Sequence, residues 1–508
     1  MRYLIIVYCY FCFFTVTAQD RLLPIAQQFK DQAHHSGTNF TPVFPITNSV
    51  AKYYKMTMDS SKRYSAVGYF LYKRELIELK TAEGNLWITP LFDVSMGKGM
   101  TDSSRISQNT RGMRVEGTFG KKVFYSTSFY ENQAVFAHYF SDYISQRGEL
   151  YYKPADSSYY TQNAVVPGAA RTKSFKTNGY DYAFAFGNIH WKMTKKITVD
   201  WGNNAYFVGS GYRSMLWSDN SIRAINLRAT MQLTPRISWQ FVRMRGLNLL
   251  RKPFAENAEA YYEPTSLSFH TIYFQPTKNS SIGIFEGGNW LRGDSLQKTP
   301  IQGLYFLPLP GITSLQEKWK NDAYSLIGID GKIHFKNWMI YGQIGRSAFT
   351  KNSAVGQVGA RFHWFNNKSC FLQIEYNFAE KNACLANQPR INYANYQLPL
   401  AHPMGSNLSE FVVRFNGEWK RFFVNGTINY YAKQNSNYQS LLPLYVEQVN
   451  TNQQVYHQLI ELGYHFNKAI GFQVFGSLRY RQLIADKSAN TWVNVGVRTQ
   501  LINHYSDF

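Results

Sequence analysis

Arginine side chains recur in segments of this chain where polar and apolar residues alternate. They are Arg114, Arg228, Arg361, Arg414, Arg479 and Arg498. If these segments are β-strands, parity places the arginines on one face, together with Glu116, Asp330, Glu375 and Glu418. A guanidinium group presents its N–H donors as a rigid fork that suits carboxylate or phosphate. The face could therefore bind an anionic ligand, or its arginines and acids could pair with one another as filling, and the sequence leaves both interpretations open.

The chain offers little support for catalysis. Its 11 histidines are scattered, and His34-His35 is the only adjacent pair, with only Asp31 near enough in sequence to complete a metal site. Separate strands could assemble a serine, a histidine and an acid, as in an outer-membrane phospholipase, but no motif indicates it. The tripeptide Arg292-Gly293-Asp294 is too short to be informative. We therefore expect no enzymatic activity, no cofactor and no bound metal.

Residues 1–18 have the pattern of a secretory signal peptide. A short basic start at Arg2 precedes an apolar stretch from Tyr3 to Phe14, and small residues suitable for cleavage follow at Val16 and Ala18. The remaining chain has no apolar run of the length, about 18 residues, that a membrane-spanning helix needs. We therefore expect an exported protein without a transmembrane helix.

From residue 85 onward, segments of about ten residues carry apolar or aromatic side chains at every second position, which is the period of a strand. In one of them Ile374 and Tyr376, expected to face lipid, alternate with Gln373, Glu375 and Asn377. We predict an all-β fold, a transmembrane outer-membrane β-barrel of about 18 antiparallel strands over residues 85–508. The predicted strands are 85–97, 109–119, 122–131, 180–192, 195–206, 222–233, 236–246, 265–275, 280–290, 322–335, 337–346, 354–365, 369–380, 408–418, 421–432, 454–466, 469–481 and 490–502.

The connections support a barrel, because outer-membrane barrels have short periplasmic turns and longer outer loops. Short connections are predicted at Gly120-Lys121, Met193-Thr194, Thr234-Pro235, Pro276 to Asn279, Lys336, Asn366 to Lys368, Trp419-Lys420 and Asn467-Lys468. Between them lie longer connections, among them 132–179, 291–321, 381–407 and 433–453. Phe508, soon after the last predicted strand, resembles the terminal aromatic assembly signal of outer-membrane proteins. This alternation predicts that all short turns lie on the periplasmic side.

Residues 19–84 fit the strand pattern poorly and contain the possible amphipathic segment LPIAQQFKDQ at 23–32. We interpret them as an N-terminal periplasmic extension or plug. Eighteen strands enclose a lumen wide enough to need a plug unless the barrel is an open pore. The 48-residue connection from Asn132 to Gly179 is also long enough to fold inward.

The formal net charge of +22 indicates an anionic partner. Nothing in the sequence resembles a nucleic-acid-binding module, so we expect no nucleic acid. The aromatic-rich loop from Leu150 to Tyr160 would suit the faces of sugar rings. The segment GLYFLPLPGI at 303–312 groups apolar residues in an outer loop, where they would be exposed unless they met the barrel wall or a partner.

Two loop segments carry a family resemblance. In 201–221 it rests on Gly209, Gly211, Tyr212, Arg213, Ser214 and Asp219, and in 396–415 on Pro399, Leu400, Ala401, His402, Pro403, Gly405 and Asn407. On these residues the chain resembles the capsule-assembly Wzi family, particularly its Bacteroidetes members, the RemB-like gliding-motility outer-membrane proteins. The likeness extends weakly over most of the barrel.

The resemblance implies an eighteen-stranded barrel that holds surface polysaccharide on the cell without catalysis. It makes Tyr212, Arg213, Asp219, His402 and Asn407 candidate ligand contacts, beside the luminal arginines. The alternative is that both segments are structural loops folded into the barrel mouth. The enterobacterial members have a helical plug, of which this sequence gives only a weak signal.

The sequence thus predicts a non-enzymatic barrel in the cell outer membrane that binds anionic or neutral surface polysaccharide. Its other expected partners are outer-membrane lipid and other envelope proteins. Two alternative functions are a subunit of a gliding-motility or secretion-associated complex and a diffusion channel that prefers anions.

Overall fold

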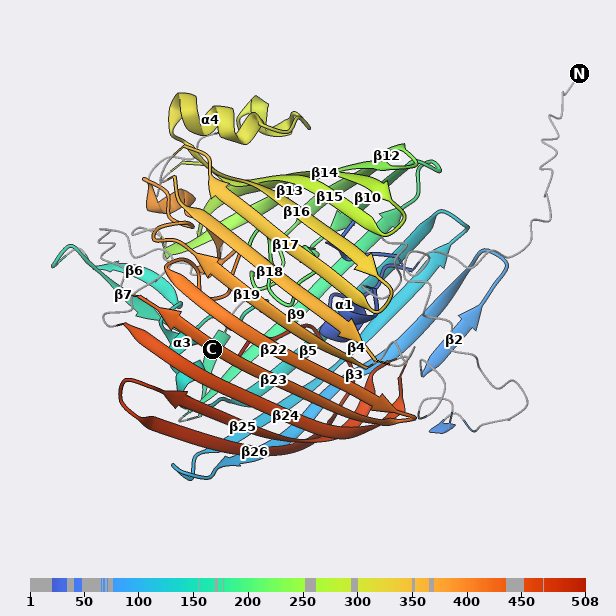
Figure 1. Cartoon of the computed structure of the whole chain (residues 1–508), viewed down its shortest axis with the longest axis vertical. Helices are drawn as coiled ribbons and strands as arrows, with labels where there is room; N and C mark the ends of the chain where they lie inside the picture. The colour runs from blue at the N-terminus through green and yellow to red at the C-terminus, as the bar shows by residue number, and fades with distance from the viewer. Residues whose placement is uncertain are drawn as a thin grey trace, which may run out of the picture.

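Eighteen antiparallel strands close into a barrel in the computed structural model, with the last strand, β26, paired to the first, β3 (Figure 1). The strands are β3 Gly84–Gly99, β4 Arg105–Phe119, β5 Val123–Val135, β9 Gly179–Trp191, β10 Ile197–Gly202, β12 Asn226–Thr234, β13 Ile237–Arg251, β14 Tyr262–Thr277, β15 Ser280–Leu291, β16 Ala323–Phe335, β17 Trp338–Ser347, β18 Ala354–His363, β19 Phe371–Ala379, β22 Leu408–Trp419, β23 Phe422–Lys433, β24 Gln453–Asn467, β25 Phe472–Leu483 and β26 Ser488–Arg498. The predicted fold class and strand number are confirmed.

The structure describes residues 21–33, 41–47, 65, 67–68, 71, 76–153, 155–169, 172–176, 178–251, 262–293, 300–349, 352–364, 370–434, 452–468 and 470–508. The predicted signal peptide, His34-His35, Asp294 and the turn from Asn366 to Lys368 lie outside these residues.

Alternation along the strands separates two faces. On β19 the side chains of Gln373, Glu375 and Asn377 are buried inside the barrel, whereas Ile374 and Tyr376 are exposed on its outer wall. Similar exposed apolar residues surround the barrel, as the lipid-facing band of a membrane barrel requires. They include Leu227, Leu233, Ile282, Ile284, Ile327, Ile329, Ile344, Val358, Ile460, Leu462, Val493 and Val495. The predicted assignment of the two faces is therefore confirmed.

The predicted alternation of connection lengths holds only in part. The connections that follow β4, β9, β12, β14, β16, β22 and β24 are short and define one end, the short-turn end. The opposite, long-loop end carries the connections 136–178, 292–322 and 380–407. Three connections at this end are nevertheless short, 100–104, 348–353 and 484–487; the first and last are short because β3, β4, β25 and β26 extend further than predicted. The strict alternation was wrong at these three places.

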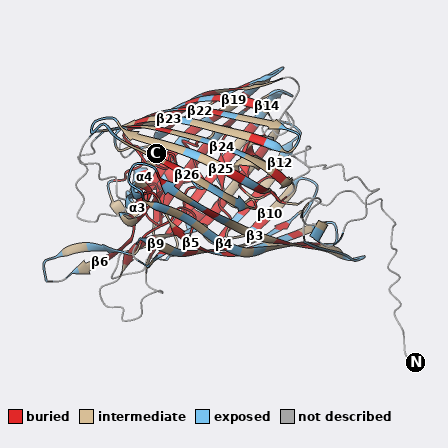
Figure 2. Cartoon of the chain, turned by 90° about the horizontal axis from the view of Figure 1, so that it is seen from below, coloured by how far each residue is buried: buried red, intermediate tan, exposed pale blue. Residues whose placement is uncertain are grey.

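Segments outside the barrel wall fill much of the lumen, and buried residues gather there (Figure 2). Residues 203–225 and 381–407 fold inward, and Met215, Leu216 and Trp217 pack on the wall residues Leu267 and Phe269 in one apolar cluster. The smaller elements are α1 Gln27–Ala33, β1 Val43–Phe44, β2 Ile77–Lys80, α3 His138–Ser145, β6 Glu149–Lys153, β7 Ser158–Gln162, β8 Thr172–Phe175, β11 Phe207–Val208, η1 Gly303–Phe306, α4 Ile312–Lys320, η2 Pro389–Ile391, β20 Ala394–Asn395 and β21 Leu398–Pro399.

Helix α1, Gln27–Ala33, overlaps the amphipathic segment that the sequence indicated at 23–32, and it lies inside the barrel. Helix α3 belongs to the long connection after β5 and also turns inward, burying Phe140, Tyr143 and Ile144. Among the described residues, no helix is both long and apolar enough to cross a membrane.

Phe508 does not end a barrel strand. The last strand stops at Arg498, and the residues after it run back into the lumen, where the Phe508 ring meets Tyr143 at a centroid distance of 4.4 Å. The Nε of Arg481 donates to the Phe508 backbone carbonyl over 3.0 Å. Phe508 thus lies soon after the last strand, as predicted, and packs as part of the luminal filling, while its likeness to an assembly signal stays a prediction.

The two ends can be distinguished in cells. An epitope tag inserted at Asp156, in the β6–β7 turn of the long-loop end, is expected to bind antibody on intact cells. Tags at Gly120 and at Lys468, in short turns, should bind only after the outer membrane is opened, because consecutive strands of a closed barrel must alternate in direction. Whole-cell antibody labelling measures this, and surface labelling at Lys468 would reverse the proposed orientation.

Candidate functional site

Two inward segments meet inside the barrel, residues 203–225 and 381–407, which contain the residues that suggested a family. Gly209 has a φ of +126°, a conformation that L side chains rarely adopt. A Cβ atom there would also lie 2.2 Å from the Nε2 atom of Gln343 on β17. Glycine is thus required for this loop to approach the barrel wall.

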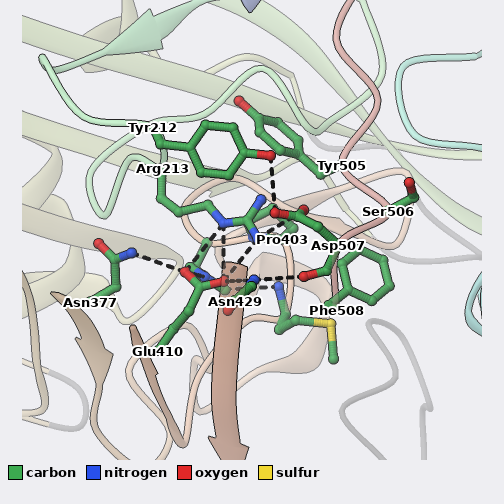
Figure 3. Close-up of polar contacts among 12 residues, drawn as sticks. Tyr212, Arg213, Asn377, Pro403, Glu410, Asn429, Tyr505, Ser506, Asp507 and Phe508 are labelled. Atoms are coloured by element: carbon green, nitrogen blue, oxygen red, sulfur yellow. Dashed lines mark hydrogen bonds and ion pairs between the residues drawn. The ribbon is translucent and has the colours of Figure 1, made fainter. Parts of the chain in front are cut away.

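Arg213 lies at the centre of a buried ionic network (Figure 3). Its side chain is fully buried; its Nε and Nη2 atoms donate to the Glu410 carboxylate, and Nη2 also donates to Asp507 at 3.0 Å. Its backbone N–H donates to Glu375 at 3.0 Å. A buried cation is tolerated when it is paired and hydrogen-bonded in this way.

Glu410, on β22, gathers several donors besides Arg213. Its carboxylate lies 2.8 Å from the Nε2 atom of His402 and accepts hydrogen bonds from the side-chain amides of Asn377 and Asn429. The hydroxyl of Tyr212 donates to Asp507 at 3.0 Å. The network therefore joins the two inward segments, the barrel wall and the residues after β26.

A second network holds helix α1. The Asp31 carboxylate accepts hydrogen bonds from Arg361 on β18 and Arg414 on β22, both at 2.9 Å. Burial raises the pKa of the Asp31 carboxyl, but the Arg414 and Arg361 guanidinium groups outweigh that effect and lower the pKa to about 2. The aspartate consequently stays ionised, and α1 is fastened to the wall by two ion pairs.

The adjacent Lys30 connects α1 to the loop segment. Its ammonium group donates to the Tyr505 hydroxyl at 3.1 Å and lies 4.0 Å from Asp219 and 3.6 Å above the Phe207 ring. Asp219 also accepts a hydrogen bond from Tyr505 at 2.7 Å. Burial lowers the pKa of Lys30 to about 8, against the opposing effect of Asp219 and Asp31.

The remaining candidate arginines also have luminal partners. Arg228 pairs with Asp200 at 2.8 Å, and Arg498 pairs with Glu461 at 2.6 Å. Arg479 donates to the Tyr139 hydroxyl at 3.1 Å, and Arg114 donates to the Ser128 hydroxyl at 3.3 Å.

Asn407, directly before β22, donates from its side chain to the backbone carbonyl of Gln434 at 3.1 Å and adopts a left-handed φ of +61°.

The structure brings Tyr212, Arg213 and His402 into one network and Asp219 into the next, while Asn407 stands at the rim. Direct ligand contact by Arg213 or His402 would require the network to open, because both side chains are buried among partners of this chain. The geometry favours the interpretation that these two segments are structural. No local pattern pointed to their partners Glu410 and Asp507, which lie 197 and 294 positions away from Arg213.

A cavity of about 660 Å³ remains in the lumen between α1, the residues after β26 and the wall. Arginines line it, but acids and amides do as well. Its polar lining includes Asp31, Asp93, Gln108, Asn132, Arg414, Asn416, Glu418, Asn425, Glu461, Gln473, Arg479, Asn494 and Arg498. The cavity is therefore mixed in charge rather than a continuous basic surface.

A different surface lies at the long-loop end, where the β6–β7 hairpin extends beyond the barrel rim (Figures 1 and 2). It carries two cross-strand tyrosine pairs, one on each of its faces. Tyr151 stacks on Tyr160, and Tyr152 packs on Tyr159, each pair with a ring centroid distance of 5.3 Å. Lys153 lies 5.9 Å from the Tyr160 ring. The hairpin therefore presents aromatic faces beside a positive charge.

Hydrogen bonds fix this hairpin to the barrel. Arg251 on β13 donates to Glu149 at the hairpin base from both Nε and Nη2, at 2.8 and 2.6 Å. Leu150 pairs with Leu250 of the extended β13 strand. These contacts hold the hairpin in place before a ligand binds, which reduces the conformational entropy that the hairpin would lose on binding.

In the part of the chain that the structure describes, no cluster of three or more His, Cys, Asp or Glu residues has the geometry of a metal site.

No family model matches the chain, and no curated protein matches it. The structure is similar to that of Wzi, an outer membrane protein of Escherichia coli involved in group 1 capsule assembly and described as a carbohydrate-binding β-barrel. The two share a TM-score of 0.55 and 12% sequence identity over 96% of this chain and 100% of that chain. The Pseudomonas aeruginosa outer membrane protein OprD gives a TM-score of 0.44 and 8% identity over 86% of this chain and 98% of that chain. With its closed wall and exposed apolar band, this chain is an outer-membrane β-barrel.

The Arg213 network yields a stability prediction. Replacing Glu410 with Gln should lower the free energy of unfolding by about 3 kcal/mol, because it leaves buried Arg213 with one carboxylate instead of two. Urea unfolding of the protein in lipid vesicles, followed by heat-modifiable gel mobility, measures the loss. Glu131→Gln is the matched control, since its pair with Arg111 is exposed at 3.7 Å and should contribute at most about 1 kcal/mol. Equal losses in the two variants would contradict the structural role.

Proposed function

We propose that this protein is a non-enzymatic outer-membrane barrel that binds surface polysaccharide at its long-loop end. The observation that carries the proposal is the β6–β7 hairpin, with its two tyrosine pairs beyond the rim. The C–H face of a sugar ring packs on an aromatic face, and neighbouring hydroxyls can bind the tyrosine O–H groups. Because successive strand residues point to opposite faces, the Tyr151–Tyr160 pair presents its rings on one face of the hairpin, beside Lys153. The Tyr152–Tyr159 pair lies on the other face, where Tyr159 packs against Leu150 and Leu250.

The charge beside the hairpin extends the proposal to acidic sugars. Lys153 lies next to the Tyr160 ring, and the guanidinium carbon of Arg251 lies 4.9 Å from the centroid of the Tyr151 ring. Arg251 is committed to Glu149 by a short, largely buried pair, whereas Lys153 has only an exposed pair with Asp156 at 3.9 Å, which a uronate or another anionic substituent can replace. Neutral and anionic polysaccharides are both compatible with this surface.

The filled lumen supports attachment rather than transport. Helix α1 is tied to the wall through Asp31, and the residues after β26 are tied to Arg213 through Asp507. Arg213, His402, Tyr212 and Asp219 would act by holding these inner segments, while the ligand binds at the rim. The similarity to Wzi, whose carbohydrate binding is stated for that protein, agrees with this proposal at the level of the fold.

A hairpin variant tests the proposal. Tyr151→Ala/Tyr160→Ala should weaken binding of purified exopolysaccharide from the producing cells at least tenfold, or about 1.4 kcal/mol, because it removes the stacked faces. Binding is measured by surface-immobilised protein and by polysaccharide retention on cells. Tyr151→Phe/Tyr160→Phe keeps the rings and should bind within threefold of the parent.

Thr161→Ala, also exposed on β7, provides a second control that alters the hairpin without touching a ring. Unchanged binding in the double alanine variant would remove the hairpin from the site. An equal loss in the phenylalanine variant would point to the hydroxyl groups instead of the aromatic faces.

The anion-preferring channel is the second candidate, because Arg414, Arg479 and Arg498 line the luminal cavity. Reconstituted protein in a planar bilayer should carry no steady anion-selective current, since α1 and the residues after β26 occupy the lumen. A steady current with chloride preference would favour the channel and contradict the attachment role.

A further inference from the structure

Residues 300–320, here called the outer flap, lie on the outside of the barrel, against the upper wall formed by β13 to β16 (Figure 1). Strand parity shows which wall residues they cover. On β15, Phe285 and Asn289 face the lumen, so Glu286 and Trp290 face outward, in line with the exposed Ile282 and Ile284.

The flap supplies hydrogen-bond partners to polar groups that face outward from the wall. Arg243 on β13 donates to the backbone carbonyls of Tyr305 and Leu307, at 2.5 and 2.6 Å. Glu286 accepts hydrogen bonds from the backbone N–H of Ser314 at 2.9 Å and from its hydroxyl at 2.8 Å. The wall beneath the flap is therefore charged, and the flap satisfies that charge.

Helix α4 consequently turns its polar side toward the outer surface of the barrel wall. Thr313, Ser314, Gln316 and Glu317 are buried against the wall, and Glu317 accepts hydrogen bonds from Ser325 on β16. The opposite side carries Leu315 and Trp319. A helix on a water-exposed surface has the reverse arrangement, with polar residues outward.

The exposed side of the flap is largely apolar. Phe306 is 60% exposed, Leu309 54% and Trp319 66%, and Leu307 and Leu315 are also exposed. Apolar residues in such a group indicate a non-aqueous contact. This patch continues downward into the apolar band of the barrel wall.

The height of the flap identifies that contact. On β16, outward-facing Phe335, Ile333, Ile329 and Ile327 form an exposed apolar run from the short-turn end upward. Ser325, which meets α4, stands ten positions above Phe335. A strand crosses the hydrocarbon core in about 9 to 11 residues. The flap therefore lies at the outer edge of that core.

We propose that the outer flap is an interfacial membrane element, with Phe306, Leu309, Leu315 and Trp319 inserted among the lipids of the outer leaflet. The exposed ammonium groups of Lys318 and Lys320 flank Trp319 and would meet the phosphate groups of those lipids. The occupant of this surface is lipid, because the patch is continuous with the lipid-facing wall. The proposal does not depend on polysaccharide binding.

Spin labels test the placement. Cysteines at Leu309 and Trp319 are introduced singly into full-length Cys370→Ala/Cys384→Ala protein, labelled and reconstituted in vesicles of phosphatidylcholine and phosphatidylglycerol. Collision rates with oxygen, which concentrates in lipid, and with a neutral nickel chelate, which stays in water, are then compared. Both positions should favour oxygen, as a label at Ile284 in the apolar band should.

A label at Thr161 on the β6–β7 hairpin is the aqueous reference. Nickel accessibility at positions 309 and 319 equal to that at Thr161 would overturn the proposal, as would low accessibility to both reagents, which indicates protein packing. Leu315→Gln/Trp319→Gln leaves the polar side of α4 intact and therefore should fold. It should increase trypsin cleavage after Lys318 and Lys320 in vesicles severalfold, and an unchanged cleavage rate would also contradict lipid insertion.

Discussion

The pairing of charges between the barrel wall and the segments inside it is the constraint on which this structure depends. Eighteen strands enclose more space than their own side chains can fill. The wall contributes Arg361 and Arg414, and α1 contributes the one carboxylate, Asp31, that satisfies both. The wall contributes Glu410, and the inward segments contribute Arg213 and His402. Each inner segment is positioned by a charge that would be costly to leave buried without it.

The same requirement explains the outer wall. Arg243 and Glu286 face outward near the proposed boundary between water and lipid. The flap covers both side chains, so they contact neither water nor lipid. The polar side of α4 packs against the barrel wall, so its apolar side faces away from the protein. Inside and outside the barrel, polar side chains of the wall pair with polar groups of the segment that covers them. The opposite face of that segment is then free to contact its own surroundings.

Sequence reasoning was most successful where the relevant signal is local. Alternation with a period of two is a property of neighbouring residues, so the faces of β19 and the number of barrel strands could be predicted. The tertiary pairs could not. Asp31 meets Arg414 across 383 positions, and Arg213 meets Asp507 across 294. Nothing in the residues around Asp507 distinguishes it from a solvated aspartate, and nothing around Phe508 indicates that its ring packs on Tyr143 inside the barrel.

The distribution of positive charge refines what the net value of +22 means. Candidate arginines in the lumen have carboxylate or hydroxyl partners and contribute little field to an approaching anion. Unlike them, many basic residues of the short turns are exposed: Lys121, Lys122, Lys195, Lys196, Arg236, Lys278, Lys336 and Lys420. Exposed aromatic residues adjoin several of these turns, such as Phe335 and Trp338 beside Lys336. Exposed positive charge is thus present along the short-turn edge of the barrel, where it can attract phosphate groups, because an exposed cation acts on its surroundings while a buried pair acts mainly on the fold.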